Sequence, residues 1–112
     1  MANKLYKPLL IDSIKAAENI VQQRFIGFDG KYCKSGAKAF GISDVDTEKD
    51  QYLPISVFGI LLVEAGGTVA VGDSITSDDN GKAVKAEGSA IVNGYALDNG
   101  ADGQIIRILI GK

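Results

Sequence analysis

The chain has 112 residues, 12 of them basic and 14 acidic, with a net charge of −2 and no histidine. This length indicates one domain with one modest core. The balanced charge excludes the basic surface that nucleic acid or an anionic membrane would require, and the longest apolar stretch, residues 55–63, is too short to cross a bilayer.

Glycine is unusually frequent. The chain has 14 glycines, against roughly 8 at an average usage of about 7%. Glycines scattered between short apolar runs predict a mainly β chain with many tight turns, folded as a small barrel or sandwich. The single cysteine, Cys33, cannot form an internal disulfide, which fits synthesis in a reducing compartment.

The first residues have little apolar character and end in a proline. We therefore expect residues 1–8 to form a flexible N-terminal arm and residues 9–112 to form the β domain. Residues 9–15 alternate and favour a strand, followed by an irregular link over residues 16–20. A helix over residues 13–23 stays open as the alternative, because apolar side chains there also recur near helical spacing.

The rest of the chain reads as short strands separated by turns and loops. Strands are predicted over residues 24–28, 38–43, 52–64, 68–71, 74–77, 82–86, 90–97 and 104–110. Residues 44–51 carry five charges and predict a solvated loop. The run VFGILLV is too apolar for a strand with one wet face, so we expect both faces to be covered or the strand to bend at Gly59.

Several positions are predicted to shape turns. Asn80-Gly81, within SDDNG, is the strongest hairpin signal and predicts a type I′ turn with positive φ at both residues. Gly94 predicts a kink or bulge. Gly72 and Asp73 predict a turn that leads into the strand over residues 74–77.

The block VGDSIT resembles the segment that carries the nucleophile of the GDS-type esterases. A serine nucleophile needs an adjacent base, which in those enzymes is a histidine, and this chain has none. No Ser-x-x-Lys spacing surrounds Ser74 either. We therefore interpret the block as a turn that enters a strand.

Other candidate sites fail on spacing. Asp44 begins a pattern like a calcium loop, but Lys49 stands where glycine is needed and Ile55 where a bidentate glutamate is needed. The adjacent pair Asp78-Asp79 points apart on any strand or turn. Lys82 lies past its hairpin tip, unlike the lysine of a lipoyl or biotinyl carrier domain. The sequence therefore predicts neither a metal nor a cofactor.

Four ordered pieces carry a resemblance to a known family. They are SIKAAENIVQQRFIGFDGKY, AKAFGISDVD, GILLVEAGGTVAVGDSITSDDNGKAV and GYALDNGADGQIIRILI, and together they cover most of residues 9–110. With these pieces the chain resembles the bacteriophage capsid cement, or head decoration, proteins. No single piece is a catalytic signature.

The resemblance implies a β-tulip fold like that of the phage lambda head decoration protein. It implies a homotrimer on the outer surface of the phage head, with the major capsid protein as partner, after synthesis in the host cytoplasm. It implies no enzymatic activity, no cofactor, and no nucleic-acid or membrane partner. The alternative is a small β domain of another phage structure, such as a tail tube or head-completion protein.

The N-terminal arm supplies the expected capsid contacts, because an unstructured segment can add a strand to a neighbouring sheet edge. The candidates are Tyr6, Pro8, Leu9, Leu10 and Ile11.

Overall fold

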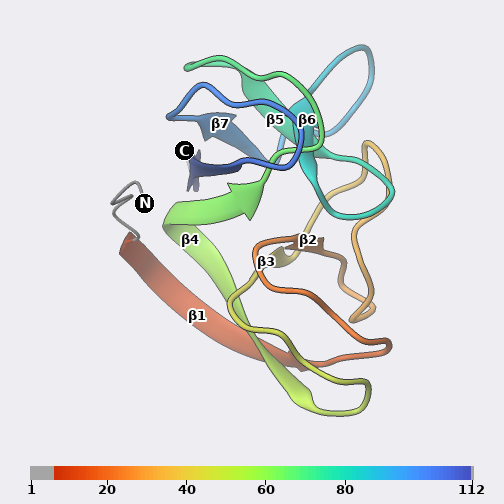
Figure 1. Ribbon diagram of the computed structural model, residues 1–112. Coiled ribbons are helices and arrows are strands. Elements are labelled where there is room, and N and C mark those ends of the chain that lie inside the picture. Colours follow the sequence, from red (N-terminus) through yellow and green to blue (C-terminus); the bar gives the residue numbers. More distant parts are fainter. Residues whose placement is uncertain (1–6, 112) are drawn as a thin grey trace.

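The computed structural model describes residues 7–111, with side chains from Leu10 onward. Its strands are β1 (Lys7–Lys15), β2 (Phe25–Ile26), β3 (Gly41–Ser43), β4 (Tyr52–Glu64), β5 (Ser74–Ser77), β6 (Ala83–Lys85), β7 (Gly94–Ala96) and β8 (Ile105–Ile110) (Figure 1). They form one sheet in the order β2-β3-β4-β8-β7-β5-β6, with β1 paired to β4 outside that path. The described residues contain no helix, and so none that could cross a membrane. The predicted mainly β fold is confirmed.

One half of the sheet closes on itself. Ala65, which directly follows β4, bridges in parallel to Ala83 at the start of β6, and the Gly66 N–H donates to the Ala83 carbonyl at 2.8 Å. The path β4-β8-β7-β5-β6 therefore returns to the end of β4 as a small barrel. The other half, made of β1, β2, β3 and the first part of β4, stays open.

Strand β4 runs through both halves, and alternate side chains on it are buried. Leu53 and Ile55 pack in a cluster under the open half with Ala16, Ile20 and Ile26. Leu61 and Val63 pack inside the barrel with apolar side chains from β5, β7 and β8. Gly59 separates the two groups with a φ of 116°, a backbone conformation that favours glycine.

The segment after β1 forms no helix because its backbone groups bond to distant segments. The Ala16 N–H donates to the Gln51 carbonyl, the Ala17 N–H to the Gly30 carbonyl, and Ile20 pairs with Thr47. A helix would need those groups for bonds four residues apart. The strand followed by an irregular link is therefore the correct alternative.

Residues 68–71 do not form the predicted strand. Val69 alone bridges, to Gly100. The next two backbone donors are taken by side chains: the Ala70 N–H donates to Asp73 Oδ2 and the Val71 N–H to Asn99 Oδ1, each at 2.9 Å. Side-chain acceptors thus end the ladder after one pair.

The predicted strand over residues 90–97 is shortened to β7. Asn93, which is 5% exposed, accepts from the Ala39 N–H and donates to the Ala37 carbonyl, so it binds a neighbouring loop. Gly94 begins β7 in regular register with β5, and is not a bulge. A Cβ there would lie 2.9 Å from the Leu109 carbonyl oxygen, so close strand packing accounts for this glycine.

The β5–β6 hairpin forms where expected, but its turn is not type I′. Gly81 has a φ of 75°, but the φ of Asn80 is not positive, and a type I′ turn needs positive φ at both residues. The Asp78 N–H donates to the Lys82 carbonyl, which leaves a three-residue loop with glycine in the left-handed position. Asp78 Oδ1 accepts from the N–H groups of Asn80 and Lys82, and this favours the longer loop.

The strands predicted over residues 24–28, 38–43 and 82–86 are shorter in the structure, as β2, β3 and β6. The strands over residues 52–64 and 74–77 are confirmed residue for residue. Strand β1 starts at Lys7, two residues before the predicted domain boundary, so Lys7 and Pro8 belong to the sheet. Residues 1–6 of the predicted arm lie outside the described part of the chain.

We expect Gly81→Val to destabilise the fold more than Gly72→Val. Both glycines have positive φ, but a Cβ at Gly81 would lie 2.5 Å from the Phe25 carbonyl oxygen, whereas one at Gly72 meets nothing within 4 Å. Strain of about 1–2 kcal/mol is common to both variants, and crowding adds roughly 1–3 kcal/mol at Gly81 only. Urea unfolding of the two variants measures the difference. Equal free energies would contradict the close contact.

Candidate functional site

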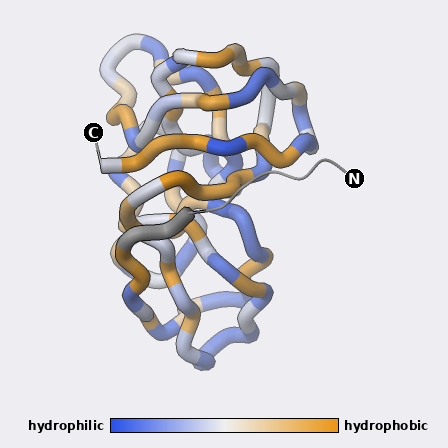
Figure 2. Tube along the Cα trace, turned by 90° about the vertical axis from the view of Figure 1, so that its left-hand side faces the viewer, coloured by the Kyte–Doolittle hydropathy of each residue, from blue (hydrophilic) through white to orange (hydrophobic). Residues whose placement is uncertain are grey.

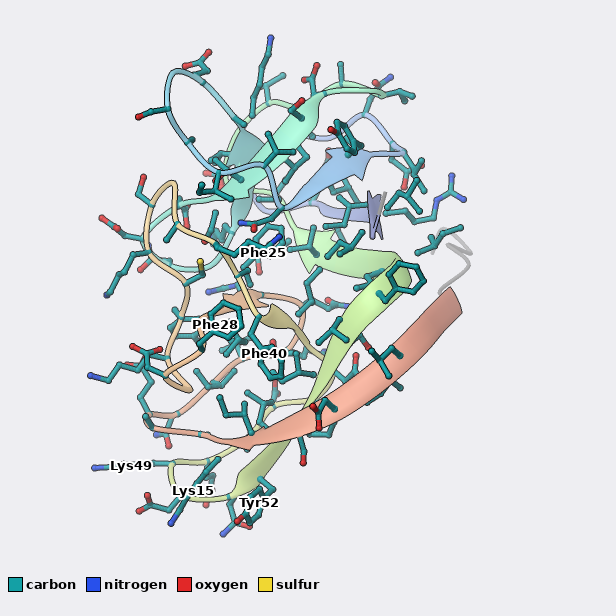
Figure 3. The ribbon with its side chains drawn as sticks, turned by 180° about the vertical axis from the view of Figure 1, so that it is seen from behind. Lys15, Phe25, Phe28, Phe40, Lys49 and Tyr52 are labelled. Carbon is teal, nitrogen blue, oxygen red and sulfur yellow. The ribbon has the colours of Figure 1, made fainter. Side chains whose placement is uncertain are left out.

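Strand β1 has a free edge. It pairs with β4 from Lys7↔Ile60 to Lys15↔Tyr52, and no other described strand pairs with it. In Figure 1 it lies at the margin of the sheet, and Figure 3 shows Lys15 and Tyr52 together at the far end of the β1–β4 pair. Such an edge offers unpaired N–H and C=O groups to an added strand.

Four of the predicted contact residues, Pro8 to Ile11, belong to this edge strand. Leu10 is 56% exposed and Ile11 is 52% exposed, which is high for large apolar side chains in a strand. Pro8 and Leu9 lie in β1 by their backbone, and the register of β1 against β4 shifts between Pro8 and Ile11. Tyr6 lies outside the described residues. The structure thus brings Leu10 and Ile11 to an accessible edge.

A second apolar surface lies outside the barrel, and the sequence analysis did not single it out. In β4, β8 and β7 the buried residues alternate with half-buried ones that face away from the core. Cross-strand partners share a face, and the pairs Ile60↔Leu109 and Tyr95↔Leu109 join the three strands. We call this surface the outer face: Ile60, Leu62, Tyr95, Ile105, Arg107 and Leu109. Figure 2 shows the tube of β8, which leads to the C-terminus, as largely hydrophobic.

A groove lies where the open half of the sheet meets the barrel. Its volume is about 340 Å³, and its walls include Phe28, Phe40, Val57, Val92, Tyr95 and Gly111. Phe28 is 64% exposed, and its ring centre lies 5.4 Å from that of Phe40. Figure 3 shows the two rings side by side. The groove is open, polar and apolar atoms contribute about equally to its lining, and Lys38 is the charged residue of its wall.

A cluster of charges ties the end of β4 to the β5–β6 hairpin. Glu64 accepts from Arg24 Nη2 at 3.2 Å through one oxygen, and Lys82 Nζ lies 3.2 Å from the other. Burial raises the pKa of the Glu64 carboxyl, but the hydrogen bond from Lys82 and the charge of Arg24 outweigh burial, so the pKa lies below its usual value. The carboxylate therefore stays charged and paired.

The predicted turn residues do not form a catalytic arrangement. Gly72 has a φ of 89°, Asp73 Oδ2 accepts from the Ala70 N–H, and Ser74 is the first residue of β5. The Asp73 carboxylate thus holds a turn. Within residues 7–111 no group of three His, Cys, Asp or Glu side chains lies close enough to hold a metal ion.

Cys33 is buried, and its thiol lies 3.5 Å from the Ala37 carbonyl and 3.6 Å from that of Lys34. Burial raises the pKa of the Cys33 thiol, more than hydrogen bonding by Ser77 lowers it. A buried thiol with a raised pKa is a poor nucleophile, so Cys33 serves packing.

Comparison with known proteins places the chain among phage structural proteins. The family model described as phage cement protein matches residues 8–110. The fold is similar to that in the crystal structure of the head fiber gp8.5 N base of bacteriophage phi29, with a TM-score of 0.76 and 22% identity. The similarity covers 91% of this chain and 93% of that one.

We expect stability to fall in acid partly through Glu64. Because its pKa is lower in the folded chain than the value of about 4.3 in the unfolded one, its ion pairs stabilise the fold above that value. This contribution is lost as the pH falls through the folded pKa. Glu64→Gln should therefore be less stable than the wild type at pH 7 and lose less stability on acidification.

Thermal melting at pH 7 and pH 3 measures this effect. Glu87→Gln, at an exposed position, is the matched control and should follow the wild type. If Glu64→Gln loses as much stability in acid as the wild type, the ion pairs of Glu64 contribute nothing to the pH dependence.

Proposed function

This chain belongs to the phage cement proteins, a family of capsid-associated structural proteins, and from that membership we propose that it binds the outer surface of the expanded phage head. There it stabilises the shell against the pressure of the packed DNA. The observation that carries the proposal is the free edge of β1 with Leu10 and Ile11 exposed on it, next to the start of the chain.

Mass action explains how such a protein strengthens a head. A protein that binds only the expanded lattice lowers the free energy of that state relative to every competing state, by an amount that grows with its concentration over Kd. Pairing with an exposed strand edge supplies backbone hydrogen bonds, and alternate side chains supply specificity. The edge of β1 and the side chains of Leu10 and Ile11 offer both kinds of contact.

We further propose that the protein binds as a homotrimer, with the major capsid protein as partner. A trimer that bridges several capsid subunits multiplies modest contacts through effective concentration. The three-fold and quasi-three-fold positions between hexamers suit such a unit, as does a β-tulip fold like that of the lambda head decoration protein.

The proposed role requires neither a cofactor nor a reaction. The arrangement of the candidate residues supports this: Asp73 holds a turn, Ser74 starts a strand, and Cys33 is a buried thiol. The functional surfaces are apolar, as expected of a protein that works by binding.

Reconstitution on heads that lack the protein tests the proposal. The purified chain should bind expanded heads to saturation, and should raise the temperature at which DNA-filled heads rupture. Cryo-electron microscopy should then show density at three-fold and quasi-three-fold positions. Failure to bind expanded heads, or density confined to hexamer centres, would contradict the proposal.

Deletion of residues 2–6 should lower the occupancy on heads and leave the domain folded. Strand β1 starts at Lys7, so this deletion spares the sheet. Ordering a free segment costs about 1–2 kcal/mol per residue in backbone entropy, which capsid contacts to Tyr6 and its neighbours must outweigh.

Bound copies of the full-length and shortened chains are compared by gel densitometry. The double variant Leu10→Ser/Ile11→Ser is the companion, because it alters the edge without shortening the chain. A shortened chain that binds as well as the full-length chain would exclude residues 2–6 from the contact.

A further inference from the structure

The regular part of the β1 edge begins after its register shifts. Pro8 has no N–H, and the register of β1 against β4 shifts twice between Pro8 and Ile11. From Ile11 to Lys15 the pairing with β4 is continuous. An added strand therefore finds a regular ladder only along this second part of the edge.

In this second part the backbone of Ser13 faces the free edge. Ser13 lies opposite Pro54, whose carbonyl accepts from the Asp44 N–H, just after β3 on the other side of β4. Antiparallel partners alternate between hydrogen-bonded and non-hydrogen-bonded pairs, and Pro54 has no N–H to give to β1. Ser13 and Pro54 are thus a non-hydrogen-bonded pair, and the Ser13 N–H points toward the position of an added strand.

The Ser13 N–H already has an acceptor, because it donates to Asp12 Oδ1 at 2.8 Å. Asp12 is exposed, yet it lies on the same face of the sheet as its cross-strand partner Ile55, which is fully buried. A charged side chain that points inward on an edge strand protects that edge against unwanted pairing. An incoming strand must therefore displace the Asp12 carboxylate before it can pair with Ser13.

Displacement of this carboxylate is unfavourable unless the incoming strand replaces what is lost. The carboxylate would give up its hydrogen bond and part of its hydration. No described lysine or arginine forms an ion pair with Asp12 to offset that loss. A strand that carries a basic side chain would offset it, through a charge-assisted hydrogen bond to the displaced carboxylate.

We propose that the β1 edge pairs with an extended capsid segment that carries a lysine or arginine, and that Asp12 selects this segment. The inference rests on the proposed function and names the chemistry of the partner. Strands without a basic side chain are rejected at Ser13, so one residue both protects the edge and chooses what binds there.

Binding to expanded heads that lack the protein tests this selection. Asp12→Asn keeps an oxygen that can accept from Ser13 and removes the charge, so it should weaken binding about three- to tenfold at roughly 0.05 M salt. Asp12→Lys should weaken binding further, because like charges then meet. Both differences should shrink at roughly 0.5 M salt, where an exposed charge pair is screened.

Glu87→Gln is the matched control for the loss of one negative charge. Glu87 is exposed in the loop between β6 and β7, which projects away from β1 (Figure 1), so this variant should bind as the wild type does at both salt concentrations. Circular dichroism checks that every variant is folded before binding is compared.

Two results would overturn this inference and leave the proposed function standing. One is an Asp12→Asn variant that binds heads as well as the wild type at low salt. The other is an Asp12→Asn variant that binds more tightly, which would make the carboxylate a barrier to every strand. Heads that bind neither the wild type nor any variant would contradict the proposed function, and this inference with it.

Discussion

The fold depends on strand β4, which belongs both to the open half of the sheet and to the barrel. Strand β4 is paired along both edges at Gly59 and Ile60, with β1 on one side and β8 on the other. Its alternate residues fill the cluster under the open half and then the interior of the barrel. Gly59, with a φ of 116°, lies between these two parts. Without β4 neither half has a complete core.

The candidate surfaces follow from the same strand. The side chains of Ile60 and Leu62 face away from the barrel and stay half-buried, since the described chain has no second layer to cover them. Strand β1 is held along one edge only, so its other edge and the exposed side chains of Leu10 and Ile11 remain available. A chain of this size with so many short strands has too few residues to cover both faces of its sheet, which leaves these apolar side chains accessible.

Sequence reasoning predicted the strands where local chemistry decides, and failed where distant groups compete. The bounds of strand β4 were predicted correctly because no nearby polar side chain competes for the backbone of this long apolar run. Residues 68–71 form no strand because the side chains of Asp73 and Asn99 accept from their backbone N–H groups. Leu10 and Ile11 were predicted as capsid contacts, and both are exposed in β1, but the free edge of that strand was not predicted. The outer face was not predicted. The run VFGILLV gave a signal, because its apolar residues fall on both sides of the strand. The continuation of the face over β7 and β8, however, depends on a strand order that no local pattern encodes.

Both ends of the loop between β6 and β7 are held by hydrogen bonds to β5, whatever the length of the loop between them. The Ala86 N–H donates to the Ser74 carbonyl and the Asn93 N–H to the Ile75 carbonyl, each at 2.7 Å, so β5 fixes both ends. Between them Gly88 has open space around it, and Figure 1 shows the loop projecting away from β1. Because closure entropy grows only with the logarithm of loop length, foreign peptides inserted at Gly88 would add little strain. If β1 contacts the capsid as proposed, this loop is a suitable position for displaying epitopes or enzymes on the particle.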